Sequence, residues 1–447
     1  MITNIDKLLE NVLKNIIFMN KPLKDKYLGI FVYSIFWILF WLSINTMPFE
    51  IYLFGESFIK SINSLRLLIP LILSIFLIIF SLYKLSFAKV LFYFKEYNST
   101  YLFLFLFSTQ FVSIIFNDYR NFNLDNIYLV ILSYGTIFLF LTVNSDREKK
   151  LKYFLKINIF FLCLVCLVIL SPKVDDIISN KLNFYFIFAE LDGNILKQVN
   201  PRITGLSRSF AILSLFMLAF YFNNKNQYYK LLILIIFLIF NFFIITMESR
   251  GTILCFFLST IFIILFLNSS EINVKIILIV TLIISNLTFL KISSKEIINI
   301  KDNNANFRLF NTNSSGRVEI WKHIVKNNDY KKFLGLGSQG DRYFLKNYKN
   351  KDIFGNNSSN AFLYTLLSGG YLGLIFLLMI YFNLLRKIFY GIKQTYHDPY
   401  YTFSVSVILF FLIRSLFENS FGLFSIDYLL IFSSILYIDS FHSKKNN

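Results

Sequence analysis

The sequence predicts an all-α integral membrane protein, a bundle of about twelve transmembrane helices with two large loops on the outer side. The chain has 447 residues, of which 56% are hydrophobic and 19% aromatic, and a mean hydropathy of +0.60, which is well above that of soluble domains. Apolar stretches that approach the roughly 17 to 25 residues needed to cross a bilayer recur from Leu28 almost to the C-terminus. No series of short alternating strands suggests an outer-membrane barrel.

Twelve apolar stretches are interpreted as membrane spans. They cover residues 28–46, 65–82, 100–116, 126–143, 157–170, 206–222, 229–247, 251–267, 274–292, 361–382, 401–418 and 423–440. The predicted organisation is an N-terminal segment (1–27), spans 1–5 (28–170), an outer loop (171–205), spans 6–9 (206–292), a large outer loop with a short helix (293–360), spans 10–12 (361–440) and a tail (441–447).

The basic residues predict how the bundle is oriented. With the N-terminus inside, most lysines fall on short inner segments, whereas the short outer loops carry only Lys60, Arg66, Arg120 and Arg250. The positive-inside rule therefore predicts that both termini are cytoplasmic. Membrane topology accounts in this way for much of the net charge of +18, so the charge does not indicate a nucleic-acid partner. In segment 1–27, apolar residues at helical spacing beside lysines predict an amphipathic helix on the inner surface.

Three motifs follow in the second half of the chain. "GRVEIWKHIVKN" reads as a helix within the large outer loop, because Arg317 and Trp321 lie four residues apart, as do Glu319 and His323. "GLGSQG", residues 335–340, matches a dinucleotide-binding pattern that requires a preceding strand, a following helix and a later acidic residue, but it lies in a predicted outer loop where a dinucleotide is not expected, so we interpret it as a flexible turn near the substrate or a simple loop reversal. "SSNAFLYTLLSGGYLG" opens the tenth span, and its glycines predict close helix packing.

Arginines gather at the predicted outer ends of the spans. Arg202, Arg208 and Arg250 lie there, as does Arg414, whose spacing from Glu418 we interpret as an intrahelical ion pair. A single such arginine can serve as an interfacial anchor. Several converging guanidinium forks can instead bind a pyrophosphate and stabilise it as a leaving group without a metal. No Asp-x-Asp pair and no two-histidine cluster occurs, so we expect no metal site.

Five motifs together resemble the O-antigen polymerase and O-antigen ligase superfamily. They are "RITGL" from Arg202, "SRG" ending at Gly251, "SGRVEIW" ending at Trp321, the "GLG" turn, and "SNAFLYTLLSGGYLG" from Ser359. The resemblance implies a polytopic GT-C-like glycosyltransferase of the bacterial inner membrane, without a cofactor, that uses a glycan on undecaprenyl pyrophosphate as donor. Ligases of the superfamily carry a histidine that is separated from a later glycine by ten intervening residues. Here the glycine is Gly370 and Ser359 holds the histidine position, which favours a polymerase.

The resemblance and the residue chemistry together imply roles for ten side chains. Arg202, Arg250, Arg317 and Glu248 are the expected catalytic residues, and Arg208, Ser359, Asn360, His323, Arg414 and Glu418 are the expected substrate-binding residues. The base that accepts the proton of the acceptor hydroxyl stays open among Glu248, Asp341, His323 and Glu418.

The expected partners follow from the same resemblance. They are an undecaprenyl-pyrophosphate-linked oligosaccharide as both donor and acceptor, membrane lipid, a chain-length regulator and a flippase, and no nucleic acid. The alternative within the enzyme class is a ligase that moves the glycan to lipid A core, or a protein O-glycosylase. From other classes, a lipid-linked glycan flippase and a membrane scaffold remain. A flippase should carry polar groups along a path through both leaflets, whereas this chain concentrates its arginines at one face.

Overall fold

The structure, a computed structural model, is mostly helical in its described part. It describes residues 30–38, 68–79, 98–116, 130–137, 147–170, 203–247, 249–267, 275–276, 279–280, 282–284, 317–326, 333–346, 357–392, 398–421 and 426–446. None of these residues lies in a strand, which confirms the predicted all-α class. The predicted amphipathic helix in segment 1–27 lies outside the described residues.

Ten α-helices and one π-helical turn are labelled here. They are α6 (Asn98–Ile115), α8 (Arg147–Leu170), α11 (Ile203–Asn223), α12 (Gln227–Thr246), α13 (Arg250–Phe262) continued by η2 (Ile263–Leu267), α15 (Arg317–Lys326), α16 (Gly340–Lys346), α17 (Ala361–Ile392), α18 (Pro399–Arg414) and α19 (Ile426–Asn446). Residues 30–38, 68–79 and 130–137 are also helical.

Four of the described helices are long and apolar enough to cross a membrane. They are α6, the Gly205–Asn223 part of α11, α12, and the Ala361–Gly391 part of α17, while Leu68–Ile79, Arg250–Phe266 and α18 are shorter apolar helices. These helices indicate a multi-pass membrane protein. The total of twelve spans, the inner-membrane location and the cytoplasmic termini stay predictions.

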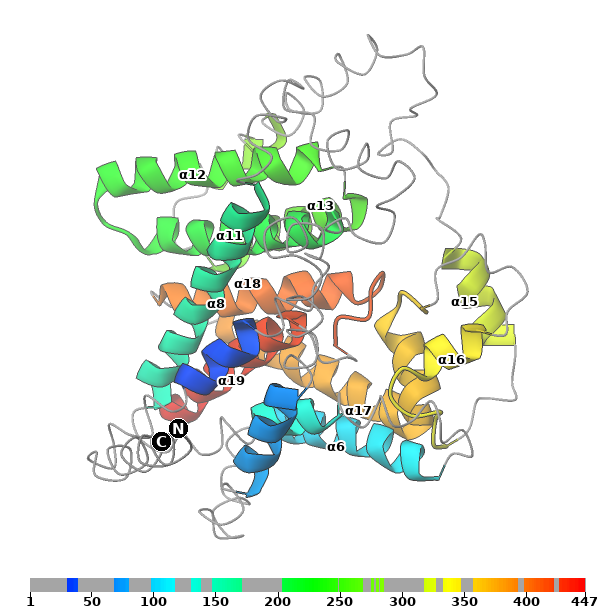
Figure 1. The fold of residues 1–447 in the computed structure, drawn as a ribbon. Coiled ribbons are helices and arrows are strands. Elements are labelled where there is room, and N and C mark those ends of the chain that lie inside the picture. The colour runs from blue at the N-terminus through cyan, green and yellow to red at the C-terminus, as the bar shows by residue number, and fades with distance from the viewer. Residues whose placement is uncertain are drawn as a thin grey trace, which may run out of the picture.

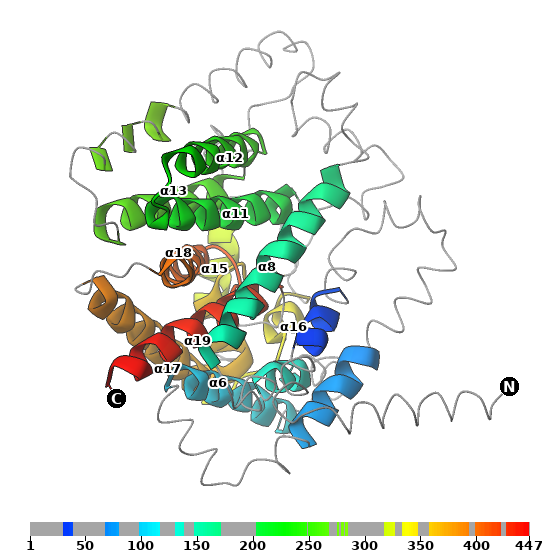
Figure 2. The same cartoon turned by 90° about the vertical axis from the view of Figure 1, so that its left-hand side faces the viewer.

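Helix α18 lies at the centre of the bundle. It contacts α11 and α13 on one side and α19 on another (Figure 1), and the view along its axis shows the same arrangement (Figure 2). Every side chain from Tyr401 to Leu412 is buried, as expected for a helix that is apolar all round. Two residues define the N-terminus of this helix. The side chain of Asp398 caps it by accepting a hydrogen bond from Tyr400 N, and Pro399 occupies the first turn.

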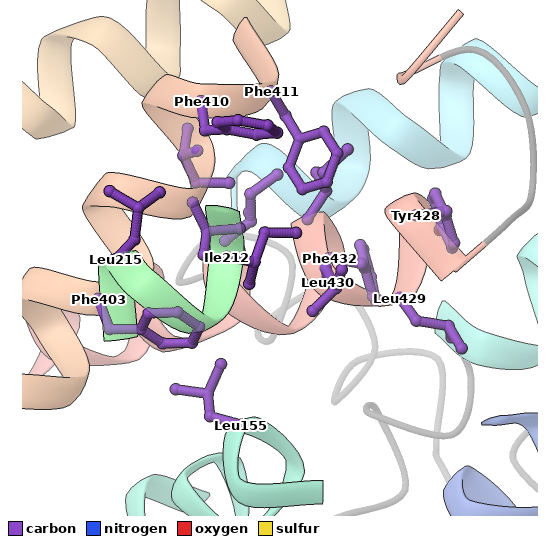
Figure 3. Close-up of a cluster of buried hydrophobic side chains, with 14 of the residues drawn as sticks. Leu155, Ile212, Leu215, Phe403, Phe410, Phe411, Tyr428, Leu429, Leu430 and Phe432 are labelled. Carbon is purple, nitrogen blue, oxygen red and sulfur yellow. The ribbon is translucent and has the colours of Figure 1, made fainter. Parts of the chain in front are cut away.

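The core around α18 is built from aromatic and branched side chains. Leu155, Ile212, Phe403 and Phe432 come from four different helices and lie close together in Figure 3. Ring pairs such as Phe103–Tyr428, with centroids 6.2 Å apart and planes at 79°, add about 0.5–1.5 kcal/mol each beyond area burial. In a lipid-facing bundle such packing, rather than hydrophobic transfer, holds the helices together.

Polar side chains also join helices inside this core. Asn158 of α8 accepts hydrogen bonds at Oδ1 from Tyr33 Oη (2.8 Å) and Trp37 Nε1 (2.7 Å), and donates from Nδ2 to Ser433 Oγ of α19 (2.7 Å). The helix at 30–38 is thereby fixed to α8 and α19. Every polar group of this asparagine side chain has a partner, so its burial is not penalised.

Helix α17 is interrupted at Gly370, which has φ +68° and ψ −163°. Residues 333–337 pack into the interruption and satisfy the backbone groups that it frees. The hydrogen bonds run from Leu336 N to Leu367 O (2.7 Å), from Gly337 N to Ser368 O (2.9 Å) and from Leu372 N to Phe333 O (3.3 Å). A Cβ at Gly335 would lie 2.6 Å from Gly370 N, so the close approach of the two segments requires glycine there.

The predicted packing role of the glycines in the tenth span is confirmed. A Cβ at Gly369 would lie 2.8 Å from Thr109 Oγ1 of α6, and a Cβ at Gly373 would lie 3.1 Å from the same atom. Small residues at these positions let α17 approach α6 closely.

Candidate functional site

Three of the predicted arginines form ion pairs with carboxylates at one end of the bundle. We call this group the arginine face; it consists of Arg208, Arg414, Arg317, Asp427 and Glu418. Arg208 lies in the first turns of α11, Arg414 ends α18, and Asp427 lies in the first turn of α19. Because these helices run in alternating directions, the three residues reach the same end.

One carboxylate oxygen serves two of these arginines. Asp427 Oδ2 lies 2.7 Å from Arg208 Nη1 and 2.6 Å from Arg414 Nη1. Arg414 Nη1 also donates to Ser420 Oγ at 3.0 Å. The side chains of Arg414 and Asp427 are each only 8% exposed, so both arginines are held in fixed positions. Such preorganised donors suit recognition of an anion.

The predicted intrahelical ion pair between Arg414 and Glu418 is wrong, and the predicted eleventh span at 401–418 is too long. Helix α18 ends at Arg414, and Ser415 is its C-cap. Residues 415–421 form turns instead of continuing the helix. Glu418 therefore does not lie one helical turn beyond Arg414, where an ion pair between residues four apart would form. Each partner instead binds a residue from elsewhere: Arg414 binds Asp427, and Glu418 binds Arg317.

Helix α15, predicted from "GRVEIWKHIVKN", is confirmed and lies beside the arginine face (Figure 1). Arg317 Nη2 lies 3.2 Å from Glu418 Oε1, and these side chains are 34% and 33% exposed. Trp321 Nε1 donates to Ser358 O at 2.8 Å, which ties the helix to the chain just before α17. On the apolar side, Ile320 and Ile324 pack with Phe344 of α16.

Asp341 is the centre of a buried hydrogen-bond network that joins three segments. Its Oδ2 accepts from Ser358 N (2.8 Å), Ser358 Oγ (3.0 Å) and Asn419 Nδ2 (3.3 Å), and its Oδ1 accepts from Arg342 N (2.9 Å). Burial raises the pKa of the Asp341 carboxyl above its ordinary value, and the hydrogen bonds from Ser358 oppose that shift. The network connects α16 to the entrance of α17 and to the turn after α18.

Ser359 and Asn360, both predicted to bind substrate, stand where α17 begins. Asn360 Oδ1 accepts hydrogen bonds from Phe362 N (2.9 Å) and Leu363 N (3.0 Å), and so caps the helix. Asn360 N donates to Asn419 Oδ1 at 2.9 Å. Ser359 has φ +45°, an uncommon conformation for a residue other than glycine, and its hydroxyl donates to Asn357 Oδ1 at 2.5 Å. This backbone conformation is held by the bonds on either side of it.

Of the other predicted catalytic residues, the structure describes Arg250 but not Arg202 or Glu248. Arg250 begins α13, which packs against α11 and α18, and its side chain is half-buried.

His323 and the glycine-rich motif have local environments of their own. The His323 ring lies 5.3 Å from the ring of Phe344, and partial burial lowers the pKa of this imidazole. Residues 335–340 form the predicted turn, which packs on α17 and leads into α16. Gly337 has φ +91°, which favours glycine at that position.

Sequence reasoning missed four residues that build this end of the molecule: Asp427, Ser358, Asn419 and Ser420. One signal was available for Asp427, because an ionisable residue at the start of an apolar span is a functional-site candidate by default. The other three are short polar residues in an Asn- and Ser-rich chain, and their type carries no comparable signal.

The opposite end of the bundle carries lysines, and we call it the lysine face: Lys152 and Lys387 with Asp398 and Asp439. Lys387 Nζ lies 2.5 Å from Asp439 Oδ1 and donates to Ser99 Oγ at 3.0 Å. Lys152 Nζ lies 3.2 Å from Asp398 Oδ2, which also accepts from Tyr437 Oη at 2.6 Å. Asp439 follows Asp427 by twelve residues on α19, which is about 18 Å along the helix.

Comparison with known protein families gives a match over residues 233–378 to the family described as O-antigen ligase. The match starts within α12 and ends within α17, so it includes Arg250, Arg317, Asp341 and Asn360. It supports membership of the O-antigen ligase and polymerase superfamily, as the motifs predicted. No curated protein matches the chain.

Proposed function

We propose that this chain is a polymerase of the O-antigen ligase and polymerase superfamily. It would transfer a growing O-antigen or capsular glycan from undecaprenyl pyrophosphate to a hydroxyl of another lipid-linked repeat unit, at the outer face of the bacterial inner membrane. The family match supports glycosyltransferase chemistry of this kind. Metal independence and the identity of the substrate belong to the proposal.

The convergence of arginines is the observation that carries the proposal. At the arginine face, three arginines share two carboxylates, and Arg208 and Arg414 depend on a single oxygen of Asp427. A guanidinium has five N–H donors, and among the described residues only Nη1 of Arg208 and of Arg414 is engaged, so the other donors of this pair are the ones we expect to bind an anion. Arg250 begins α13, which packs against the two helices that carry Arg208 and Arg414. In the proposed complex Arg208, Arg250 and Arg414 bind the pyrophosphate, and Arg202 stays a prediction of the resemblance.

The reaction follows from these roles. The acceptor oxygen attacks the anomeric carbon of the donor sugar, the bond from that carbon to the phosphate oxygen breaks, and undecaprenyl pyrophosphate leaves with the electron pair. An ionised pyrophosphate needs little acid assistance, and the arginines stabilise the charge that develops on it. The acceptor hydroxyl must also lose its proton, which requires a base.

Ser359 favours a polymerase over a ligase, because it stands where the ligases of the superfamily carry a histidine. Mass spectrometry of undecaprenyl-linked glycans from a strain without this protein separates the two functions. Accumulated single repeat units would support the polymerase, and accumulated long lipid-linked polymer would show a ligase instead. Transport of lipid-linked glycan by purified protein in vesicles, without any change in glycan length, would revive the flippase alternative.

A further inference from the structure

The reaction proposed above needs a proton acceptor, and four residues were candidates: Glu248, Asp341, His323 and Glu418. Glu248 lies outside the described residues. The other three side chains differ in exposure, in how many of their acceptor atoms already bind a hydrogen, and in their position relative to the arginine face. These differences favour one of them as the base.

Asp341 is placed to organise the structure rather than to accept a proton from substrate. Its side chain is buried, and both of its oxygens already accept hydrogen bonds, from Ser358, Asn419 and Arg342. An acceptor hydroxyl could reach it only by displacing bonds that hold three segments together. A base must come within hydrogen-bond reach of the proton that it removes.

His323 faces a different direction from the arginine that binds Glu418. It follows Arg317 by six residues on α15, and at 3.6 residues per turn this places the two side chains on different sides of the helix. The His323 ring lies beside Phe344 of α16. The imidazole therefore points toward the packing between α15 and α16.

Glu418 has the properties that the other candidates lack. It is one-third exposed, and its Oε1 is bound by Arg317. Among the described residues, no hydrogen bond engages its second carboxylate oxygen. It lies two residues before Ser420, whose Oγ accepts a hydrogen bond from Arg414 Nη1 at 3.0 Å, so the turn that carries it is attached to the proposed pyrophosphate site.

The residues that follow Glu418 hold it in place. Asn419 Oδ1 accepts from Asn360 N (2.9 Å) and Ser358 Oγ (3.1 Å), and Ser420 Oγ accepts from Arg414 Nη1 (3.0 Å). The turn that carries the carboxylate is thus fixed both to the entrance of α17 and to a pyrophosphate-binding arginine. Functional groups perform best when neighbouring hydrogen bonds fix their position in this way.

We propose that Glu418 is the general base of the transfer, an inference that deepens the proposed function and rests on it. The second carboxylate oxygen accepts the proton as the acceptor oxygen bonds to the anomeric carbon, and undecaprenyl pyrophosphate departs with the electron pair of the broken bond. Glu418 afterwards releases its proton to water. Arg317 acts as a positioning residue, because its bond to Oε1 directs the other oxygen toward the acceptor.

The test compares purified wild type with Glu418→Gln. The substrate is the undecaprenyl-linked repeat unit isolated from the deletion strain, and binding of undecaprenyl pyrophosphate is measured separately. General bases contribute about 100- to 10,000-fold, so we expect kcat to fall by that factor. The melting temperature should be unchanged, and the affinity for undecaprenyl pyrophosphate should be equal or higher, because Arg317 loses its counter-charge. Glu319→Gln on the exposed side of α15 is the matched control and should keep wild-type kcat.

A kcat of Glu418→Gln within about threefold of wild type would overturn the base assignment while the wild-type activity still supports the polymerase. If wild type makes no polymer from the repeat unit, the proposed function itself fails. Should Glu418→Gln not fold, Glu418→Asp decides, because it keeps the charge and withdraws the carboxylate by one methylene. A fall in kcat of about tenfold or more supports the base role, since displacement by an ångström is costly, and an unchanged kcat contradicts it.

Discussion

The two ends of the helix bundle use charged residues in different ways. At the lysine face the ion pairs Lys387–Asp439 and Lys152–Asp398 join residues from different helices or helix ends. At the arginine face two arginines share one oxygen of Asp427, and the remaining pair is one-third exposed. Ion pairs of this kind neutralise charge within the bundle and join helices. Among the described residues of the arginine face, two guanidinium groups on one carboxylate leave a net positive charge, which is the property that an anionic substrate requires.

The largest expected effect tests the proposed pyrophosphate site, to which Arg250 is assigned together with Arg208 and Arg414. Arg250→Ala should abolish polymer, with a loss of at least about 100-fold, because removal of one donor to developing negative charge typically costs this much. The amount of protein in the membrane should be unchanged. Polymer length on gels and immunoblots of membrane fractions measure the two quantities.

The matched control for Arg250 is an arginine near the other end of the bundle. Arg386 lies on an exposed side of α17, next to Lys387, and Arg386→Ala should leave polymer length and amount as in wild type. Normal polymer in Arg250→Ala would contradict the assignment of Arg250 to the proposed pyrophosphate site.

The second prediction concerns the lysine face, where we expect an effect on stability. Asp439→Ala leaves Lys387 without its carboxylate in a site that is only 16% exposed, and should lower the free energy of unfolding by about 3–5 kcal/mol. Thermal unfolding in detergent measures the change. The double variant Lys387→Met, Asp439→Leu should recover most of it, since paired removal leaves no unpaired charge. Turnover per folded molecule should stay at the wild-type value, and a specific loss of turnover would break the proposed contrast between the two ends.

The third prediction tests whether Asp341, whose network borders the arginine face, contributes to the stability of the fold. Asp341→Ala leaves buried donors of Ser358 and Asn419 without their acceptor, and should cost about 1–3 kcal/mol for each such group. Asp341→Asn keeps an acceptor oxygen and should cost less. Melting temperatures of the purified variants give the order.

The difference in stability between wild type and Asp341→Asn should depend on pH, because the pKa of the Asp341 carboxyl is raised in the folded protein. A folded-state pKa above the unfolded value gives a stability contribution that is present at low pH and is lost as the pH rises through the folded-state pKa. Lowering the pH should therefore shift the difference in stability between wild type and Asp341→Asn in favour of wild type. A difference that stays constant with pH would show that Asp341 does not titrate in this way.

The smallest expected effect concerns the docking of α15. Trp321→Phe removes the hydrogen bond from Nε1 to Ser358 O while keeping most of the ring, and should cost about 0.5–1.5 kcal/mol. We expect a small fall in melting temperature and a kcat within about threefold of wild type. Lys322→Ala, at the exposed neighbouring position, is the control. A large loss of turnover in Trp321→Phe would mean that the indole contacts substrate.

The local features of the sequence predicted the local features of the structure. Apolar periodicity and polar flanks located α6, α11, α12 and α17, and the spacing of Arg317 and Trp321 located α15. The alternation of span directions predicted that Arg208 and Arg414 would reach the same end, and their common partner Asp427 agrees with that. These inferences depend only on neighbours in sequence and on the thickness of a membrane.

The side-chain partners could not be predicted in the same way. The pairing of Arg414 with Glu418 was wrong because a four-residue spacing predicts contact only while the helix continues, and α18 ends at Arg414. The true partner of Glu418, Arg317, is 101 residues away, and that of Asp341, Asn419, is 78 away. Such contacts depend on how the long outer loop docks, and a single sequence carries no signal for that.

The interruption of α17 at Gly370 has a consequence for the order in which the chain assembles. A span whose backbone groups were left unpaired in lipid would be penalised by several kcal/mol for each group. Residues 333–337 supply the missing partners, and they precede α17 in the chain. Neither segment is complete alone, so the turn and the span should reach their final structure together, late in biogenesis. Correct insertion of this helix would then indicate that the segment with Arg317 and Asp341 has docked.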